Sequence, residues 1–483
     1  MPSISREWLL GGFSALVLGV VAVRAAAASS TTERTLLLLG TLAPFVLMVI
    51  GELRRPLLAL AILDIPLQWD RNLDYNASAA SFSAIGGFSI SLTTLALIGL
   101  YALWLADGLS KPTHRNNLNR RIAIPLAAYL LFASASIIVA PNKLLSSYEL
   151  VILLQSFLLF IYVACNTRTT AEVRFVVALL VSGFFLEGLL VVLTDRLGLN
   201  LAALGFRSQS RELSDSSFGV YRLGGTVGSP NSAGSYFAFL LPLVLAFRSM
   251  VNIRLGRQLA SLAFGIGLIA LILTFSRGAW LAFAASLVAL LFASGRYRIV
   301  SPRLALGAIL ITIALAVPFR AEIASRITGS DAGAASSRVD LLRLSIPMIG
   351  EHPILGVGLN NYSVALPQYA GPEFTGAFLS TVHNKFVLTW AETGIFALVA
   401  LLAFLGAVLT AGFRLARSPD PVIAVVAIAL TAGLVGQLIH MNVDIFKGRP
   451  QIQLLFLVGA LMSAMSSSLR RPASSLPRRG VCR

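Results

Sequence analysis

The sequence predicts an all-α integral membrane protein with about 12–14 transmembrane helices and one large extracytoplasmic loop. Composition is the first observation behind this prediction. Hydrophobic residues make up 57% of the 483 residues and charged residues 12%, about half the usual charged share of soluble domains. The second observation is that the apolar residues fall in long uninterrupted runs, and a spanning helix needs about 20 mostly apolar residues.

The net charge of +17 would indicate nucleic-acid binding in a soluble protein. In a chain this apolar, the better interpretation is that Lys and Arg flank the membrane spans and set their orientation, so no nucleic-acid partner is expected. The two cysteines, Cys165 and Cys482, lie in a span and in the C-terminal tail. No disulfide framework is therefore expected.

The first apolar run could belong to a signal peptide, because Arg6 precedes it and Ala25–Ala28 resembles a cleavage region. An uncleaved span is the preferred interpretation, since the rest of the chain is membrane-embedded and needs no separate export signal. The weakest candidate is the run at 57–67. The candidate spans lie at about 8–23, 35–50, 57–67, 88–106, 122–139, 148–165, 173–193, 231–247, 259–274, 279–293, 304–317, 386–412, 421–443 and 451–468.

Basic residues give the orientation of these spans. If the N-terminus is cytoplasmic and the spans alternate, the cytoplasmic segments carry Lys and Arg at roughly 2.6 times the density of the outside loops. An even number of spans then leaves both termini in the cytoplasm. The predicted organisation is transmembrane helices in 1–193, an extracytoplasmic loop at 194–230, transmembrane helices in 231–317, a large extracytoplasmic loop at 318–385, transmembrane helices in 386–468 and a basic cytoplasmic tail at 469–483.

The large loop at 318–385 is long enough for a small folded subdomain, and long ordered loops usually carry function. Within it, Ser336-Ser337 before a periodic stretch looks like the cap of a helix. That helix could lie flat on the membrane with its apolar face down, or pack on the core of the loop itself. The residues that share this face at i, i+3, i+7 and i+10 are Val339, Leu342, Ile346 and Ile349.

Two outside arginines lie at junctions between a loop and a span. Arg222 precedes the stretch 224–230, where glycines let backbone approach a ligand closely and the helix beginning at Pro230 favours an anion at its N-terminus. Arg277 lies in a very tight turn, where an arginine near the hydrocarbon boundary needs a partner or polar surroundings. The alternative for Arg277 is that it snorkels to lipid headgroups.

The third junction holds His383, followed by the polar residues Asn384 and Lys385. A lone histidine is more often structural, but this one shares its face with two arginines and can take a proton near neutral pH. Two arginines can hold a diphosphate and stabilise the charge that grows as it leaves. A histidine can deprotonate an attacking sugar hydroxyl. This chemistry needs neither a metal nor a cofactor, and no outside carboxylate cluster has metal-ligand spacing.

Other polar positions are weaker candidates. Asp64 and the pair His440 and Asp444 are ionisable groups in or near spans, which makes each a functional hypothesis. His114 lies in a basic cytoplasmic loop, where a solvated role is expected. The Gly-x-Gly at 356–358 follows no predicted strand, so a turn that shapes the outside site is favoured over a nucleotide site.

The segments around Arg222, Arg277, 356–362 and His383, in this order along the chain, resemble the O-antigen ligase and O-antigen polymerase superfamily of bacterial envelopes. The resemblance covers about residues 220–410. In ligases the histidine motif often ends in Gly-x-x followed by Gly, Thr or Tyr. Ala397 stands at that last position here, which leaves ligase and polymerase both open. The residues that carry the resemblance are Arg222 with Gly228-Ser229-Pro230-Asn231 and Gly234, Ser276-Arg277-Gly278, Gly356-Val357-Gly358-Leu359-Asn360-Asn361-Tyr362, and His383-Asn384 with Gly394 after nine intervening residues.

The resemblance implies a GT-C-type fold in the bacterial inner membrane, with its site on the extracytoplasmic side. It implies a glycan donor linked to undecaprenyl diphosphate, and an acceptor that is lipid A core for a ligase or another lipid-linked repeat for a polymerase of O-antigen, capsule or exopolysaccharide. By the resemblance, Arg222 and Arg277 would hold the donor diphosphate and His383 would be the base of an inverting transfer without a metal. The other substrate-binding residues expected are Asn231, Asn384, Asn360 and Tyr362.

A different class of function stays open beside this one. A transporter or flippase of the same lipid-linked glycan would use the basic face to recognise phosphate without chemistry. Transporters place key polar groups near the bilayer midplane on broken helices, whereas the favoured residues lie at the outer boundary. A cell-wall polymerase of the shape and division family is a third interpretation, but its motifs are not seen.

Overall fold

A computed structural model describes residues 53–110, 118–199, 201, 206, 210–212, 221–297, 302–328, 334–371 and 380–468. The chain divides into two compact units, Met1–Leu58 and Ala59–Arg483, and nearly all of the described residues belong to the second. The predicted spans at 8–23 and 35–50, His114 and the tail with Cys482 lie outside the described residues.

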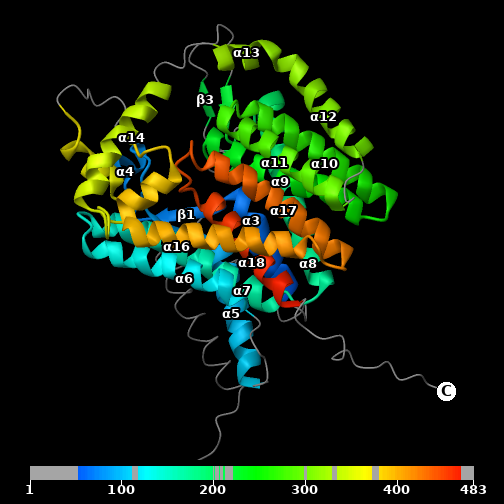
Figure 1. The fold of residues 1–483 in the computed structure, drawn as a ribbon, viewed down its shortest axis with the longest axis horizontal. Coiled ribbons are helices and arrows are strands. Elements are labelled where there is room, and N and C mark those ends of the chain that lie inside the picture. The colour runs from blue at the N-terminus through cyan, green and yellow to red at the C-terminus, as the bar shows by residue number, and fades with distance from the viewer. Residues whose placement is uncertain are drawn as a thin grey trace, which may run out of the picture. The chain divides into compact units, whose positions relative to one another are not determined.

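Helices account for most of the described chain, and every candidate span within it contains one (Figure 1). The helices are α3 (Arg54–Leu67), α4 (Ala77–Ser81), α5 (Leu92–Ser110), α6 (Arg120–Ala135), α7 (Lys143–Asn166), α8 (Thr170–Leu197), α9 (Pro230–Met250), α10 (Arg254–Leu273), α11 (Arg277–Tyr297), α12 (Pro302–Ala316), α13 (Arg320–Thr328), α14 (Ala334–Glu351), α15 (Tyr362–Ala365), α16 (Lys385–Leu415), α17 (Pro421–His440) and α18 (Arg449–Ser468), with 3-10 turns η1 (Ser136–Ile138), η2 (Val317–Phe319) and η3 (Leu366–Gln368).

Nine stretches of the described residues are helical, long and apolar enough to cross a membrane, and two further apolar helices, Leu92–Asp107 and Arg277–Ala293, are shorter. The prediction of an all-α integral membrane protein is therefore confirmed. Helix α3, the weakest candidate, has 14 residues, which span about 21 Å at about 1.5 Å per residue and fall short of a hydrocarbon core of about 30 Å. The total of 12–14 spans stays a prediction.

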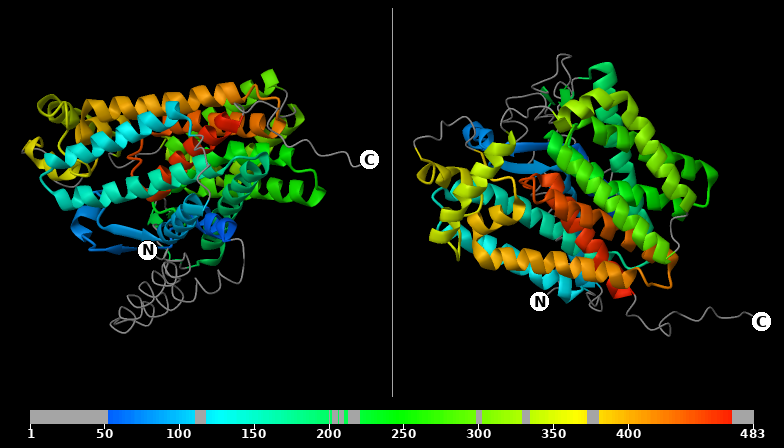
Figure 2. Two further views of the ribbon diagram at one scale, coloured as in Figure 1. Left: turned by 90° about the horizontal axis from the view of Figure 1, so that it is seen from below. Right: turned by 45° about the horizontal axis from the view of Figure 1, so that its top comes forward.

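The C-terminal helices form the centre of the second unit. Helix α17 packs on α9 and α11, α18 packs on α7, and α16 lies along α6 (Figure 2). In the most apolar part of α17, 83% of the residues are buried, and in that of α18, 89% are buried. In Leu306–Ala324 the buried share is 6%. The connection between α17 and α18 is thus enclosed by other elements, which matters for the charged residues that it carries.

Two short antiparallel strand pairs were not predicted. Strand β1 (Asp70–Leu73) pairs with β2 (Phe88–Ser91), so the apolar run at 88–106 begins as a strand before α5. Strand β3 (Ser210–Glu212) pairs with β4 (Tyr221–Leu223), with Arg211 opposite Arg222. The second pair places Arg222 on a strand instead of an irregular loop.

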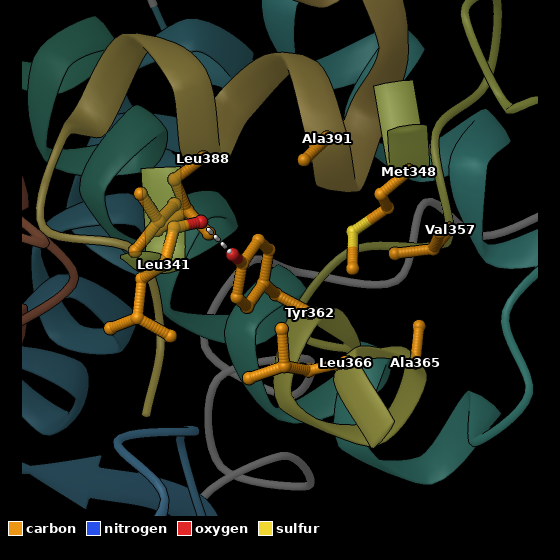
Figure 3. Close-up of a cluster of buried hydrophobic side chains, with 9 residues drawn as sticks. Leu341, Met348, Val357, Tyr362, Ala365, Leu366, Leu388 and Ala391 are labelled. Carbon is orange, nitrogen blue, oxygen red and sulfur yellow. Dashed lines mark hydrogen bonds between the residues drawn. The ribbon is translucent and has the colours of Figure 1, made fainter. Parts of the chain in front are cut away.

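The segment 318–385 contains helices with a core of their own. Figure 3 shows Leu341 and Met348 of α14 packed around Tyr362, whose hydroxyl donates to the Leu341 carbonyl at 2.9 Å. Helix α14 begins at Ala334, so Ser336 and Ser337 lie inside the helix and not at its predicted start. Of the predicted face, Ile349 packs against the loop core, whereas Val339, Leu342 and Ile346 stay exposed.

Helix α16 is interrupted at Gly394, whose φ of 80° and ψ of 175° are not helical. The segment 353–358 fills the break: the N–H groups of Val357 and Gly358 donate to the carbonyls of Ala391 and Glu392 at 2.8 and 2.9 Å. A Cβ on Gly394 would lie 1.8 Å from the carbonyl oxygen of Ile354. The Gly-x-Gly segment therefore completes a broken helix, while its predicted role in shaping the site stays a prediction.

Candidate functional site

The turn between α10 and α11 places Arg277 at the first position of α11. It is as tight as predicted, because Phe275 adopts a left-handed backbone with a φ of 46°. Arg277 is half-buried. A Cβ on Gly234 of α9 would lie 2.6 Å from the Cβ of Ala279 and 3.1 Å from Oγ1 of Thr274. A glycine is thus required for the start of α9 to approach the turn this closely.

Arg222 ties this turn to α9. Arg222 is buried in β4, with 9% of its surface exposed. Its Nε donates to the carbonyl of Thr274 at 3.1 Å, and its Nη2 donates to Oδ1 of Asn231 at 2.8 Å. Pro230 is the first residue of α9, as predicted. The contact of Arg222 with a diphosphate stays a prediction, and its bonds show that it also fixes the turn that carries Arg277.

The glycine-rich segment 224–228 folds around a carboxylate that sequence reasoning missed, Glu187 of α8. Oε1 of Glu187 accepts from the N–H of Thr226 at 2.8 Å and of Val227 at 3.3 Å, and Oε2 is bonded to the Thr226 hydroxyl. A Cβ on Gly225 would lie 2.1 Å from Oε1. This glycine lets the backbone approach a protein carboxylate, whereas the sequence alone favoured approach to a ligand.

His383 lies directly before the start of α16. Asn384 caps this helix, because its Oδ1 accepts from two N–H groups of the first turn at 3.0 and 3.1 Å. The N–H of Lys385 donates to the carbonyl of Met441 at 2.8 Å, which ties the start of α16 to the end of α17. His383 is half-buried, and its Nδ1 has no hydrogen-bond partner among the described residues.

The charges around His383 come from two other elements. Burial lowers the pKa of the His383 imidazole below its usual 6.5, and the positive charge of Arg338 on α14 lowers it further. The carboxylate of Asp444, which follows α17, and a backbone hydrogen bond with Thr381 act in the opposite direction. His383 therefore favours its neutral form, which is the form that can accept a proton.

His440 connects the surroundings of His383 with the Arg277 turn. Its Nδ1 lies 3.8 Å from Oδ2 of Asp444, and a Cβ on Gly278 would lie 3.5 Å from its Nε2. One turn earlier, Gln437 accepts a hydrogen bond from Ser235 of α9 at 3.1 Å. The end of α17 thus brings the Arg277 turn, the start of α9 and the start of α16 to one place.

Two of the predicted substrate-binding residues are inside the protein. Tyr362 is fully buried, and its hydroxyl is bonded to Ser345 at 2.8 Å. Asn360 is also fully buried. These contacts favour a structural role for both residues, while their contact with substrate stays a prediction. Oδ1 of Asn360 accepts from the N–H of Ile85 at 2.9 Å and from Nζ of Lys447 at 3.2 Å. Its Nδ2 donates to the carbonyls of Ile85 and Leu145 at 2.9 and 2.8 Å.

Asp64 has a partner that the sequence could not reveal. Nη1 of Arg449 donates to Oδ2 of Asp64 at 2.9 Å, and Nε of Arg449 lies 3.5 Å from Oδ2 of Asp70. Thr93 donates to the same Asp64 oxygen at 2.8 Å. These side chains are buried, so Asp64 belongs to a structural ion pair between α3 and α18. Within the described ranges, no group of three or more His, Cys, Asp or Glu side chains could hold a metal ion.

Residues 260–402 match the family model described as O-antigen ligase. Over this part of its length the chain is similar to O-antigen ligase. The matched segment contains Arg277, Arg338 and His383, whereas Arg222 lies before it. No curated protein matches the chain.

The O-antigen ligase domain confirms the resemblance to the ligase and polymerase superfamily. The apolar helices make the chain a multi-pass membrane protein, and the matched family is glycosyltransferase-like. Arg338 is the candidate that sequence reasoning missed. Its signal was available, because it is a basic residue at the start of the amphipathic helix in the large predicted loop.

Proposed function

We propose that this protein transfers a glycan from undecaprenyl diphosphate to a hydroxyl of an acceptor saccharide. The observation that carries the proposal is the convergence of the Arg277 turn, Arg338 and His383 around the end of α17. Cations suit a diphosphate, and a neutral imidazole suits a hydroxyl proton. The O-antigen ligase domain supports the same class of reaction.

In the proposed reaction, the acceptor hydroxyl oxygen attacks the anomeric carbon of the lipid-linked sugar. The bond from that carbon to the diphosphate oxygen breaks on the opposite face, so the configuration inverts. His383 takes the hydroxyl proton, and Arg277 and Arg338 stabilise the negative charge on the departing lipid diphosphate. Arg222 adds charge and holds the turn, as its bonds with Thr274 and Asn231 indicate. No step requires a metal ion or a cofactor.

The proposal includes the position of the reaction in the cell. The density of basic residues along the sequence supports cytoplasmic termini and a site on the extracytoplasmic face of the bacterial inner membrane, within a GT-C-type fold. Asn231 and Asn384 are half-buried beside the site and are the stronger substrate-binding candidates. For Asn360 and Tyr362 we propose that they shape the wall of the site.

The proposal is tested with purified protein in lipid, a donor linked to undecaprenyl diphosphate and a saccharide acceptor. His383→Ala, Arg277→Ala and Arg338→Ala should each lower the transfer rate by about a hundredfold or more, as expected for groups that act in the transition state. Arg343→Ala is the matched control, because Arg343 lies on the same helix as Arg338 with 74% of its side chain exposed. Near-normal transfer by His383→Ala, Arg277→Ala and Arg338→Ala would refute the mechanism.

The choice between a ligase and a polymerase needs the envelope polysaccharide of a deletion strain, separated on a gel. Full-length chains left on the carrier, with none on lipid A core, would identify a ligase. Single unpolymerised repeats would identify a polymerase of O-antigen, capsule or exopolysaccharide.

The break in α16 is the feature that would favour a transporter, since transporters bind substrates at broken helices. Here the carbonyls that the break frees, on Ala391 and Glu392, already accept from Val357 and Gly358. These two carbonyls are therefore bonded to protein N–H groups and are not open to a ligand. Liposomes settle the alternative, because a transporter would move the lipid-linked glycan across the bilayer unchanged.

A further inference from the structure

The carboxyl of Glu187 is a buried group to which the proposed reaction assigns no role. The residue lies inside α8 with 0% of its surface exposed. An isolated buried carboxyl is costly, so such groups are kept only where hydrogen bonds compensate. The hydrogen bonds of Glu187 are with the segment 224–228, at Thr226 and Val227.

The segment 224–228 is held from both sides. Glu187 accepts from the N–H groups of Thr226 and Val227, and on the opposite edge Nε2 of Gln68 donates to the carbonyls of the same two residues, with 3.0 Å to that of Thr226. The Thr226 hydroxyl is also bonded to the carbonyl of Pro66 at 2.9 Å. The N–H groups of Thr226 and Val227 are thus engaged by protein and do not face a ligand.

The segment 224–228 connects Arg222 with the start of α9, both of which lie on the side of the site proposed for the donor. Arg222 precedes it in β4, and Ser229, the N-cap of α9, follows it. Arg222 then reaches across the segment to Asn231 at 2.8 Å and to the carbonyl of Thr274 at 3.1 Å. A shift of the segment would therefore move both Arg222 and the turn that precedes Arg277.

We infer that Glu187 is a positioning residue for the donor diphosphate, acting through the segment 224–228 on Arg222 and the Arg277 turn. The inference rests on the proposed function. The hydroxyl of Thr226 carries one proton but is bonded to two oxygens, of Pro66 and Glu187. A glutamine at position 187 can keep these contacts, because its oxygen accepts from the amides and its NH2 donates to the hydroxyl while that hydroxyl donates to Pro66.

The test compares Glu187→Ala with Glu187→Gln in the purified full-length protein, with KM measured separately for the lipid-linked donor and for the acceptor. Glu187→Ala should raise the donor KM by about tenfold or more, because small misplacements of positioning groups have large effects, while the acceptor KM stays the same. Glu187→Gln should recover most of the loss. Ser156→Ala is the control, since Ser156 is equally buried but its hydroxyl bonds to Ile152 within its own helix.

A donor KM that is unchanged in Glu187→Ala, or that rises together with the acceptor KM, would overturn the inference. If Glu187→Ala does not fold, Thr226→Val removes the hydroxyl bonds alone and should raise the donor KM by about threefold, which corresponds to the loss of one ordinary hydrogen bond.

Hydrogen exchange separates this inference from the proposed function, because it needs no substrate. The amides of Thr226 and Val227 should exchange faster in Glu187→Ala than in the native protein or in Glu187→Gln. Unchanged exchange would mean that Glu187 does not hold the segment. A native protein that cannot transfer glycan from the donor would instead refute the proposed function, whatever the exchange shows.

Discussion

Replacing Lys447 by methionine should strongly destabilise the protein. Lys447 lies in the connection between α17 and α18, with 6% of its side chain exposed. Its Nζ is 2.8 Å from Oε1 of Glu392 and 3.3 Å from Oε2 of Glu149, and it donates to Asn360 at 3.2 Å. Both carboxyls are buried, so this ammonium group compensates for charges on α7 and α16 at once.

The magnitude follows from removing one member of a buried ion pair. Such a change costs about 3–5 kcal/mol in the free energy of unfolding, because an unpaired charge remains inside. Two carboxyls remain here, and neither oxygen of Glu149 has a hydrogen-bond partner among the described residues. We therefore expect the upper half of this range. Lys143→Met is the control, since Lys143 is exposed at the start of α7 and should change the free energy by less than about 0.5 kcal/mol.

The assay is unfolding in mixed micelles by titration with SDS. A loss of less than about 1 kcal/mol for Lys447→Met would refute the reasoning, since the site would then tolerate two buried carboxyls without their cation. Adding Glu149→Gln and Glu392→Gln to Lys447→Met should restore part of the loss, because neither of these two side chains then carries a charge without its cation.

The pH dependence of this contribution has a definite sign. Burial alone would lower the pKa of Lys447, but the carboxylates of Glu149 and Glu392 outweigh it and raise the pKa above the usual 10.5. A group whose pKa is raised by folding stabilises the protein fully below its unfolded value. The contribution should therefore be constant at neutral pH and disappear only as the pH rises through the folded pKa, above 10.5.

Three further predictions concern the site and the fold. The transfer rate should fall only at a pH below 6.5, because the pKa of His383 is lowered. Asp444→Asn should move the acid limb of the pH–rate profile to still lower pH, since it removes the carboxylate that raises this pKa. A limb that moves to higher pH would contradict the assignment of His383 as the base. Gly394→Ala should cost more than about 3 kcal/mol of stability or prevent folding, because strain at this backbone conformation adds to a clash with Ile354 at 1.8 Å, and normal expression with an unchanged SDS midpoint would contradict it. Tyr362→Phe should cost about 1–3 kcal/mol by leaving polar partners unpaired in the core, as measured by the same titration, and an unchanged midpoint would show that those partners find others.

The sequence predicts the helices well because their signal is local. Apolar runs locate the described spans, and Pro230 marks the start of α9 as residues at a first helical turn do. The short strands β1 and β2 escape prediction because each has only four residues and their pairing is a tertiary property. The interruption of α16 also lies inside an otherwise continuous apolar pattern, where a single glycine is commonly tolerated.

The site is harder to predict, because its residues meet only after folding. Arg277 and His383 stand out at loop junctions, but Arg338 depends on how α14 packs against α16. Asp64 and Arg449 are 385 residues apart, so no local pattern links them. Glu187 lies within an apolar helix, and only the bonds with Thr226 and Val227 explain why a carboxyl stands there.

The interruption of α16 gives importance to the order in which the segments of this chain are synthesised. The segment 353–358, which covers the open carbonyls of Ala391 and Glu392, precedes α16 in the chain and leaves the ribosome before it. The helix thus enters the bilayer with its covering segment already made, and the exposed backbone groups, which cost several kcal/mol each in lipid, need not wait for later synthesis. A circular permutant that places 353–358 after α16 would lose this order while keeping every contact of the finished protein.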